Sequence, residues 1–287
     1  MTRKSSGETY AQVRAEVSNP KGDVWWGGTG DPHLQAAEED LTEAYESPMR
    51  AELHDWAIKQ AEAADNKTIG VYSGALGFGY NKDLLAKNGL PEPKCWADLI
   101  KPEFKGQVQI ANPNSSGTAY TMLATMVQLM GEDEGFEYMK ALHKNVNQYT
   151  KSGSAPIKAA GLGENTIGIV FMHDSVAQTV AGFPIVTVAP CEGTGYEIGS
   201  MSLIKGARNP DEAKTFYDWA LTAEMQSKAK DVKSFQLPSN KSATGSPLSP
   251  DLSTIKLIDY DFKKYGSSDE RKRLLKKWDE EVSTLPQ

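Results

Sequence analysis

The sequence predicts an α/β fold with mainly parallel sheets flanked by helices. Short apolar or β-branched runs alternate with amphipathic helical runs along the chain, which is the pattern of strand–helix–strand units. The run TIGIVFM at 166–172 is apolar throughout, as is typical of a strand buried on both faces. Polar, glycine-rich loops follow the predicted strands. In open α/β sheets ligands bind beyond the carboxyl ends of the strands, so these loops are the expected binding site.

The first predicted unit consists of a helix, a strand, a loop and a second helix, over residues 8–19, 22–26, 27–32 and 33–46. Its loop, GGTGDP, is rich in glycine, which lets a ligand approach the backbone closely. Trp25 and Trp26 end the strand. Because successive strand side chains point to opposite faces, at least one of these two tryptophans is expected in the core.

The segment GQVQIANPNSSGTAY at 106–120 predicts a short strand, a loop and the start of a helix that extends to about Met130. Capping and helix-starting residues follow one another here: Asn114, Ser115, Ser116, Gly117 and Thr118. Such a turn leaves backbone N–H groups free at the positive end of a helix, where a phosphate or carboxylate binds. The alternative is an ordinary capped helix that binds nothing.

The remaining elements are assigned from periodicity and from Gly and Pro positions. Further strands are expected at 69–71, 77–80 and 184–189, with a turn at Ser73-Gly74. Further helices are expected at 82–88, 96–99, 133–144, 156–160, 209–223 (with Phe216 facing inward) and 268–282, another after Ser175, and polar loops at 147–154, 191–200 and 239–250.

Composition excludes several classes of protein. The 287 residues carry a formal net charge of −7 with acids and bases mixed, whereas a nucleic-acid-binding surface needs a basic face. No apolar run approaches the roughly 18 residues of a membrane-spanning helix. The first residues lack the apolar stretch of a signal peptide, although a mature chain would look the same. The two cysteines, Cys95 and Cys191, match no metal spacing; we expect two small buried residues, with a disulfide as the alternative.

Several separated motifs resemble bacterial extracytoplasmic solute-binding proteins of ABC importers. These motifs are WADL at 96–99 with Pro102, Lys105-Gly106, Asn112-Pro113 and SGTAY at 116–120, and also DVWWGGTGDPH, GFGYN and GARNPDEAKTFYDW. The group is that of the type 2, "ferric-binding-like" periplasmic binding proteins. The resemblance implies a periplasmic, monomeric binding protein without a cofactor. It implies two α/β lobes with a ligand cleft between them, and importer membrane subunits as partners.

The same resemblance sets expected lobe boundaries. Lobe 1 is expected to comprise residues 1–80 and 191–287, and lobe 2 residues 81–190, with hinge crossings near 77–82 and 187–192. Members of this group begin with a strand and a helix before the segment that matches Arg3 to Gly7. We therefore expect the source gene to encode about 30 further residues, by typical element lengths, and a signal sequence.

The ligand expected from these residues is a phosphorylated sugar. Ferric-binding members use adjacent tyrosines, and the chain contains no such pair, so iron is disfavoured. One set of residues suits a phosphate: Arg3, Ser5, Ser6, Gly28, Thr29, Ser116, Gly117 and Thr118. A second set, His173, Asp174 and Glu197, accepts hydrogen bonds from sugar hydroxyls and matches the hexose-phosphate-binding branch of the group. A phosphonate, phosphate or ferric complex is the alternative ligand.

Each site residue also has a structural interpretation. Asp174 could cap a helix, His173 could be structural, Glu197 could be a solvated loop acid, and Ser5-Ser6 could form a plain turn. An enzyme acting on a sugar phosphate through His173, Asp174 and Glu197 is a further alternative. Because the chain has no nucleophile elbow, no Walker loop and no metal cluster, a binding protein is favoured over an enzyme.

Overall fold

The computed structural model describes residues 1–286, which form two compact units of mixed helix and strand. Unit 1 comprises Met1–Gly74, Glu197–Ser249 and Asp261–Arg271. Unit 2 comprises Ala75–Tyr196, Pro250–Tyr260 and the chain from Lys272 onward. The α/β class predicted from the sequence is confirmed by this mixture of elements.

The predicted lobe boundaries remain a prediction. The compact units do not share all of these bounds, because residues 75–80, 191–196, 250–260 and 272 onward belong to unit 2. For the segment from 272 onward, side chains of helix α12 (Ser268–Glu281) make the contacts with unit 2. Arg273 forms an ion pair with Glu132 (2.7 Å), and Trp278 packs edge-on against Tyr149. The hinge crossings near 77–82 and 187–192 remain a prediction.

The sheet of unit 1 is built around strand β8 (Tyr196–Ile204) and the first part of β3 (Ile69–Asn81). The short strands β1 (Val24–Trp26) and β2 (Thr42–Glu43) both pair with β8 in antiparallel fashion. Strand β9 (Leu237–Pro238) pairs antiparallel with β3. The strands that precede the predicted ligand loops of this unit are therefore held by β8, which the sequence did not predict as a strand.

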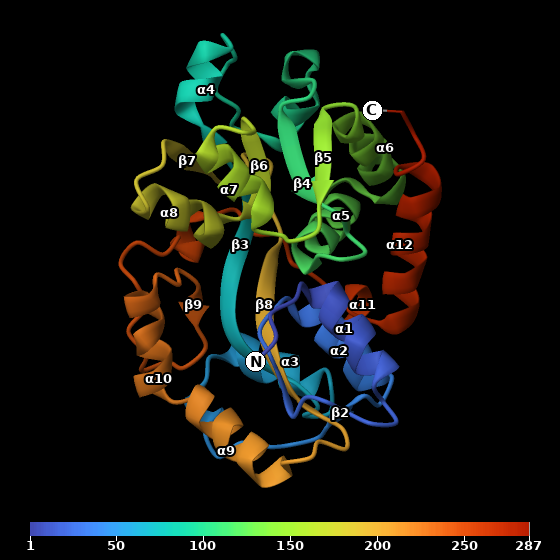
Figure 1. Ribbon diagram of the computed structural model, residues 1–287, viewed down its shortest axis with the longest axis vertical. Coiled ribbons are helices and arrows are strands. Elements are labelled where there is room, and N and C mark those ends of the chain that lie inside the picture. Colours follow the sequence, from blue (N-terminus) through green and yellow to red (C-terminus); the bar gives the residue numbers. More distant parts are fainter. Residues whose placement is uncertain (287) are drawn as a thin grey trace. The chain divides into compact units, whose positions relative to one another are not determined.

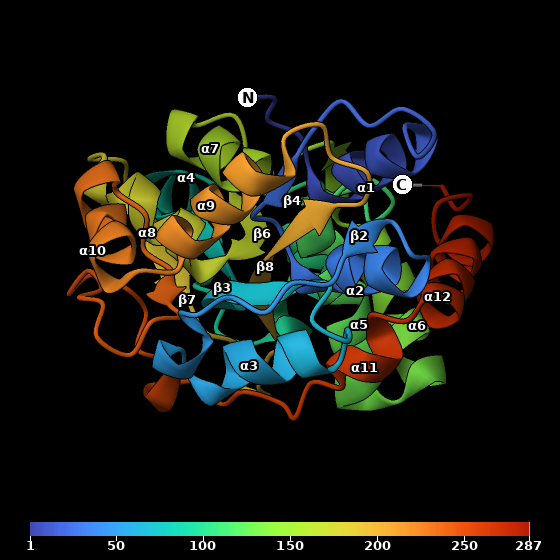
Figure 2. The ribbon, with the colours of Figure 1, turned by 90° about the horizontal axis from the view of Figure 1, so that it is seen from below.

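Helices cover the sheet of unit 1 and close its core. Its helical elements are α1 (Ser6–Ala15), α2 (Gly30–Glu38), α3 (Asp55–Glu62), α9 (Pro210–Ala220), α10 (Ala223–Ser227), α11 (Phe262–Tyr265) and the 3₁₀ turns Arg50–Glu52 and Lys228–Val232. Figure 2 shows α3 beside the sheet, where Gly70 of β3 lies close to Ala57. Val71 and Tyr217 belong to the same buried apolar cluster.

The sheet of unit 2 combines parallel and antiparallel pairs. Strand β4 (Val108–Ala111) pairs in parallel with β5 (Val146–Thr150) and with β6 (Ile167–Phe171). The second part of β3 pairs antiparallel with β6 and with β7 (Ile185–Val188). Together with the antiparallel pairs of unit 1, this arrangement shows that the prediction of mainly parallel sheets was wrong. Parallel pairing is restricted to β4 and its neighbours in the pairs described here.

The helices of unit 2 include several that pack against its strands β4, β6 and β7. The helical elements of this unit are α4 (Lys82–Lys87), α5 (Gly117–Met130), α6 (Glu132–His143), α7 (Ala155–Leu162), α8 (Met172–Val180) and the 3₁₀ turns Trp96–Ile100, Pro102–Phe104 and Leu252–Thr254. Figure 1 shows α7 and α8 next to β6 and β7. Ile157, Val170 and Ile185 form a buried cluster there. The apolar run predicted as a doubly buried strand is β6, and all five of its residues are buried.

Several local predictions were wrong. The helix expected over 33–46 ends at Glu38, and strand β2 lies within that range. Ser73-Gly74 is not a turn, because β3 continues through it for 13 residues and Ser73 Oγ donates to the Glu197 carbonyl. The predicted loops at 147–154 and 191–200 contain most of β5 and half of β8. Phe216 is 38% exposed instead of facing inward. The missed strands are formed by pairing with distant segments, which local residue preferences do not indicate.

Candidate binding site

In unit 1 the loop Gly27–Thr29 connects β1 to the N-terminus of α2. Gly27 and Gly28 have φ values of 75° and 86°, a region that side chains other than glycine rarely adopt. A Cβ on Gly28 would lie 2.6 Å from Ser6 Oγ, so the first turn of α1 rests directly on the loop. Gly28, which was predicted to let a ligand approach, thus also lets helix α1 pack against the loop.

Thr29 is the N-cap residue of α2 and is only 2% exposed. Its backbone N–H donates to Ser6 Oγ (3.2 Å). Among the described residues, its own hydroxyl oxygen is buried without a hydrogen-bond partner. A buried hydroxyl normally has a partner, so this atom is an available hydrogen-bonding group at the positive end of α2.

The other predicted residues of unit 1 occupy different surroundings. Ser5 and Ser6 are not a plain turn, because Ser5 is the N-cap of α1 and Ser6 its first residue. Arg3 is exposed. Glu197 is 4% exposed at the start of β8, so it is a buried group and not a solvated loop acid. The structure therefore brings Ser6, Gly28 and Thr29 together.

In unit 2 the helix α5 begins where the sequence predicted. Ser116 is its N-cap residue and its side chain makes no capping hydrogen bond. Gly153 approaches this helix start so closely that a Cβ there would collide with Thr118 Oγ1 and lie 2.9 Å from Ser116 Oγ. Ser116, Gly117 and Thr118 are all buried. The segment after β5 and the start of α5 therefore form one cluster of small and hydroxyl-bearing residues.

His173 and Asp174 lie in the first turn of α8, directly after β6. Asp174 Oδ2 lies 3.9 Å from His173 Nε2, and the imidazole stacks on Phe171. Burial lowers the pKa of His173, opposed in part by the Asp174 carboxylate. The imidazole is therefore neutral near pH 7, and the contact with Asp174 is not an ion pair there. A neutral imidazole beside a carboxylate presents hydrogen-bonding groups that suit hydroxyls.

Two groups that touch the unit 1 loop were not recognised from the sequence. His33 Nε2 lies 3.1 Å from the Gly27 carbonyl oxygen, and the Gly28 N–H donates to the Tyr72 hydroxyl (2.8 Å). Tyr72 is 44 positions away from Gly28 in the chain. His33 ends the DVWWGGTGDPH motif, but neither the motif nor the residues around Tyr72 indicate a contact with this loop.

Cys95 and Cys191 form a disulfide, so the expectation of two buried free cysteines was wrong. Cys191 is exposed and Cys95 half-buried. Glu192 is near both sulfurs, but its carboxylate accepts the backbone N–H groups of Trp96 and Ala97 (2.8 Å each). With its sulfurs joined and its carboxylate engaged, this cluster does not offer free ligands to a metal.

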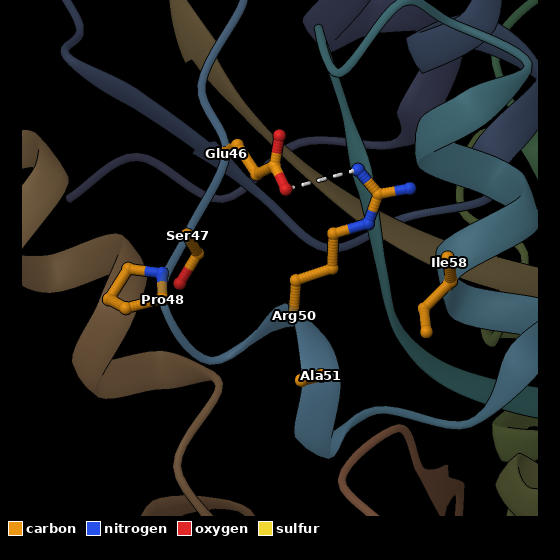
Figure 3. A pocket seen from close by; sticks show the side chains of 6 residues that line it. All are labelled: Glu46, Ser47, Pro48, Arg50, Ala51 and Ile58. Atoms are coloured by element: carbon orange, nitrogen blue, oxygen red, sulfur yellow. Dashed lines mark ion pairs between the residues drawn. The ribbon is translucent and has the colours of Figure 1, made fainter.

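A shallow surface pocket in unit 1 lies apart from all of these residues (Figure 3). It is lined by Glu46, Ser47, Pro48, Arg50, Ala51 and Ile58. Arg50 is the cation there, and its guanidinium donates to Glu62 and to Asn66 at 2.9 Å, with Glu46 at 3.6 Å. Because Arg50 already contacts two carboxylates, this pocket is not an anion site.

No helix among residues 1–286 is both long enough and apolar enough to cross a membrane.

Comparison with known proteins gives strong matches. Residues 29–264 match the family described as bacterial extracellular solute-binding protein. An uncharacterised protein of Haemophilus influenzae is 51% identical over 282 residues, which cover 98% of this chain and 82% of that protein. The structure of the periplasmic binding protein AfuA from Actinobacillus pleuropneumoniae, with exogenous fructose 6-phosphate bound, superposes with a TM-score of 0.96 at 50% identity, covering 99% of this chain and 90% of that one. The periplasmic binding protein P5PA gives a TM-score of 0.95 at 41% identity, covering 98% and 90%.

Proposed function

The chain belongs to the bacterial extracellular solute-binding protein family, and from that premise we propose that it captures a hexose phosphate for an ABC importer in the periplasm. The observation that carries the proposal is the similarity, over 99% of the chain, to a binding protein with fructose 6-phosphate bound. In this proposal the protein acts as a monomer and performs no chemistry on its ligand.

The residues of unit 1 supply one part of the anion site. The N-terminus of α2 carries a partial positive charge, and the buried Thr29 hydroxyl lies at that end. Ser6 lies against the same loop through the Thr29 N–H, and Ser5 caps the helix that Ser6 begins. Arg3, exposed nearby in sequence, adds a charge that favours the approach of an anion.

Unit 2 carries a second set of proposed ligand groups. Ser116, Gly117 and Thr118 start the 14-residue helix α5, whose first N–H groups are donors for phosphate oxygens. His173 and Asp174 would accept hydrogen bonds from sugar hydroxyls, and Glu197 of unit 1 is the third predicted acceptor. Helix ends rich in donors suit a phosphate and carboxylates suit sugar hydroxyls, so the chain carries both kinds of group that a sugar phosphate needs.

A panel of ligands tests this assignment. Thermal shifts of the purified chain would be measured with glucose 6-phosphate, fructose 6-phosphate, inorganic phosphate, a phosphonate, ferric citrate and a polyamine. We expect the two hexose phosphates to give the largest shifts, and NMR to recover them chemically unchanged. A larger shift with the phosphonate would replace the proposed ligand class, and turnover of the sugar phosphate would identify an enzyme.

Substitution of Asp174 tests the sugar end of the site. Asp174→Ala is expected to weaken binding of glucose 6-phosphate by about 1–3 kcal/mol, the scale of a lost hydrogen bond to a charged group. Asp83→Ala is the matched control, since Asp83 is also an acid in the first turn of a unit 2 helix. Isothermal titration would measure both variants. Equal affinities of Asp174→Ala and the wild type would remove Asp174 from the site.

A further inference from the structure

The Gly27–Thr29 loop needs external support to keep one conformation. Two successive glycines with positive φ have wide conformational freedom of their own, so the loop is not fixed by local preferences. Its backbone is instead bonded to strand β8, because Gly27 N–H donates to the Ser200 carbonyl (2.8 Å) and Ser200 N–H to the Gly28 carbonyl (3.1 Å). Two side chains complete this support.

The first of these side chains is the fully buried imidazole of His33. It stacks on Trp25 with 3.8 Å between ring centroids, and its Nε2 lies 3.1 Å from the Gly27 carbonyl oxygen. A carbonyl oxygen only accepts hydrogen bonds, so Nε2 carries the proton. Burial lowers the pKa of His33 to about 3, so the ring is neutral and Nδ1 accepts from Ser202 Oγ at 2.7 Å. His33 therefore has one defined tautomer.

The second side chain is the phenol of Tyr72 on β3. Its oxygen accepts the Gly28 N–H at 2.8 Å, and it would lie 3.3 Å from a Cβ placed on Gly27. The ring packs against Gly199 so closely that a Cβ there would collide with it. The position of the phenol oxygen is therefore determined by packing on β8, and the phenol in turn determines where the Gly28 amide lies.

We propose that His33 and Tyr72 are positioning residues that hold the Gly27–Thr29 loop in its binding geometry before the ligand arrives. This inference rests on the proposed function, in which the N-terminus of α2 receives the anionic group of the ligand. His33 fixes the Gly27 carbonyl, and Tyr72 fixes the Gly28 amide. The buried Thr29 hydroxyl is then presented by a loop that does not have to be ordered on binding, and preorganisation of this kind increases affinity.

Removal of the Tyr72 hydroxyl tests the positioning role. Tyr72→Phe is expected to lower the affinity for glucose 6-phosphate roughly 3- to 10-fold, the range that one hydrogen bond of ordinary net strength spans. Tyr45→Phe is the matched control, because Tyr45 is also half-buried in unit 1 and donates one 2.8 Å hydrogen bond, to Asp218, away from the loop. We expect the control to change the affinity less than about twofold. It should lower the melting temperature about as much as Tyr72→Phe does. Wild-type affinity in Tyr72→Phe, or an equal loss in Tyr45→Phe, would overturn the proposal.

NMR of the ligand-free chain provides a measurement that does not depend on the ligand. In Tyr72→Phe the amide of Gly28 should shift and exchange with solvent faster, whereas Tyr45→Phe should leave it unchanged. The ¹⁵N signals of the His33 ring should report the Nε2–H tautomer from pH 8 to pH 5. If the wild type does not bind glucose 6-phosphate, the proposed function fails, and these signals still decide the positioning role: an unchanged Gly28 amide or an Nδ1–H tautomer would overturn it.

Discussion

The loops before α2 in unit 1 and before α5 in unit 2 both end at a buried helix start, but they are built differently. The turn before α5 is formed by local bonds: Asn112 Oδ1 accepts the Asn114 N–H, and the Asn112 carbonyl accepts the Ser116 N–H, both at 2.9 Å. Two of its side chains also reach distant segments, since Asn114 donates to Asp279 (2.8 Å) and Ser115 to the Lys151 carbonyl (3.0 Å). The loop before α2 is held by Ser6 and Tyr72, which are 23 and 44 positions from their partners. A turn formed by bonds within the loop can be predicted from the local sequence, whereas a loop positioned by residues distant in the sequence cannot.

Unit 2 also contains a covalent long-range contact, a disulfide. The disulfide joins Cys95, the N-cap of the 3₁₀ turn at 96–100, to Cys191 on the connection between β7 and β8, across 96 residues. Both cysteines belong to unit 2, so unit 1 depends on noncovalent contacts alone. The two units should consequently respond differently to reduction.

Loss of the disulfide should give the largest effect. In the chain-entropy treatment a cross-link that closes about 96 residues stabilises by about 4–5 kcal/mol, so Cys95→Ser combined with Cys191→Ser should destabilise unit 2 by up to that amount. Hydrogen exchange resolved by residue would measure the loss. The amides of β4 and α5 should lose protection while those of β1 and α2 keep it. Equal losses in both groups would show that the units do not unfold separately.

Acid should act next, through His33 in unit 1. Its pKa is about 3 in the folded chain and about 6.5 when unfolded, so between these values the unfolded state binds more protons and stability falls as the pH falls. The contribution of His33 to the free energy of unfolding is fully present above pH 6.5. Below that pH it falls by about 1.4 kcal/mol per pH unit. We expect about 2 kcal/mol to be lost between pH 6.5 and pH 5 by urea unfolding.

A variant at His33 isolates this contribution from those of other histidines. His173 also has a pKa lowered by burial and adds a loss of the same sign in unit 2. His33→Gln retains an N–H donor but does not titrate, so it should show a shallower pH dependence than the wild type. An identical pH dependence in the two proteins would mean that His33 is already protonated or solvent-accessible in the folded chain.

The difference between the two loops also explains which parts of the fold could be predicted from the sequence. The start of α5 at Gly117 and the buried strand after Thr166 were predicted almost to the residue, because caps and apolar runs are local signals. The strand β8 was missed because its Tyr196–Ser200 part reads as a polar, glycine-rich loop. Gly199 is needed there because the Tyr72 ring fills the space of a side chain. That requirement is set by a residue more than a hundred positions away.

The candidate site divides in the same way. Ser116, Thr118, His173 and Asp174 follow predicted strands directly, so their positions at the starts of α5 and α8 could be anticipated. No role was predicted for His33, since nothing beside it in the sequence indicates Gly27, Ser202 or Trp25 as partners. Positioning residues of this kind are visible only once the tertiary contacts are known.

The smallest predicted effect compares two glycines with positive φ. Gly28→Ala and Gly89→Ala should each cost about 1 kcal/mol for placing a Cβ in the left-handed region. A Cβ on Gly89 meets nothing within 4 Å, whereas one on Gly28 meets Ser6 Oγ and breaks its hydrogen bond with Thr29 N–H. Gly28→Ala should therefore cost about 1 kcal/mol more than Gly89→Ala in urea unfolding, and it alone should weaken glucose 6-phosphate binding. Equal stability and equal affinity of the two variants would mean that Ser6 does not hold the unit 1 loop in place.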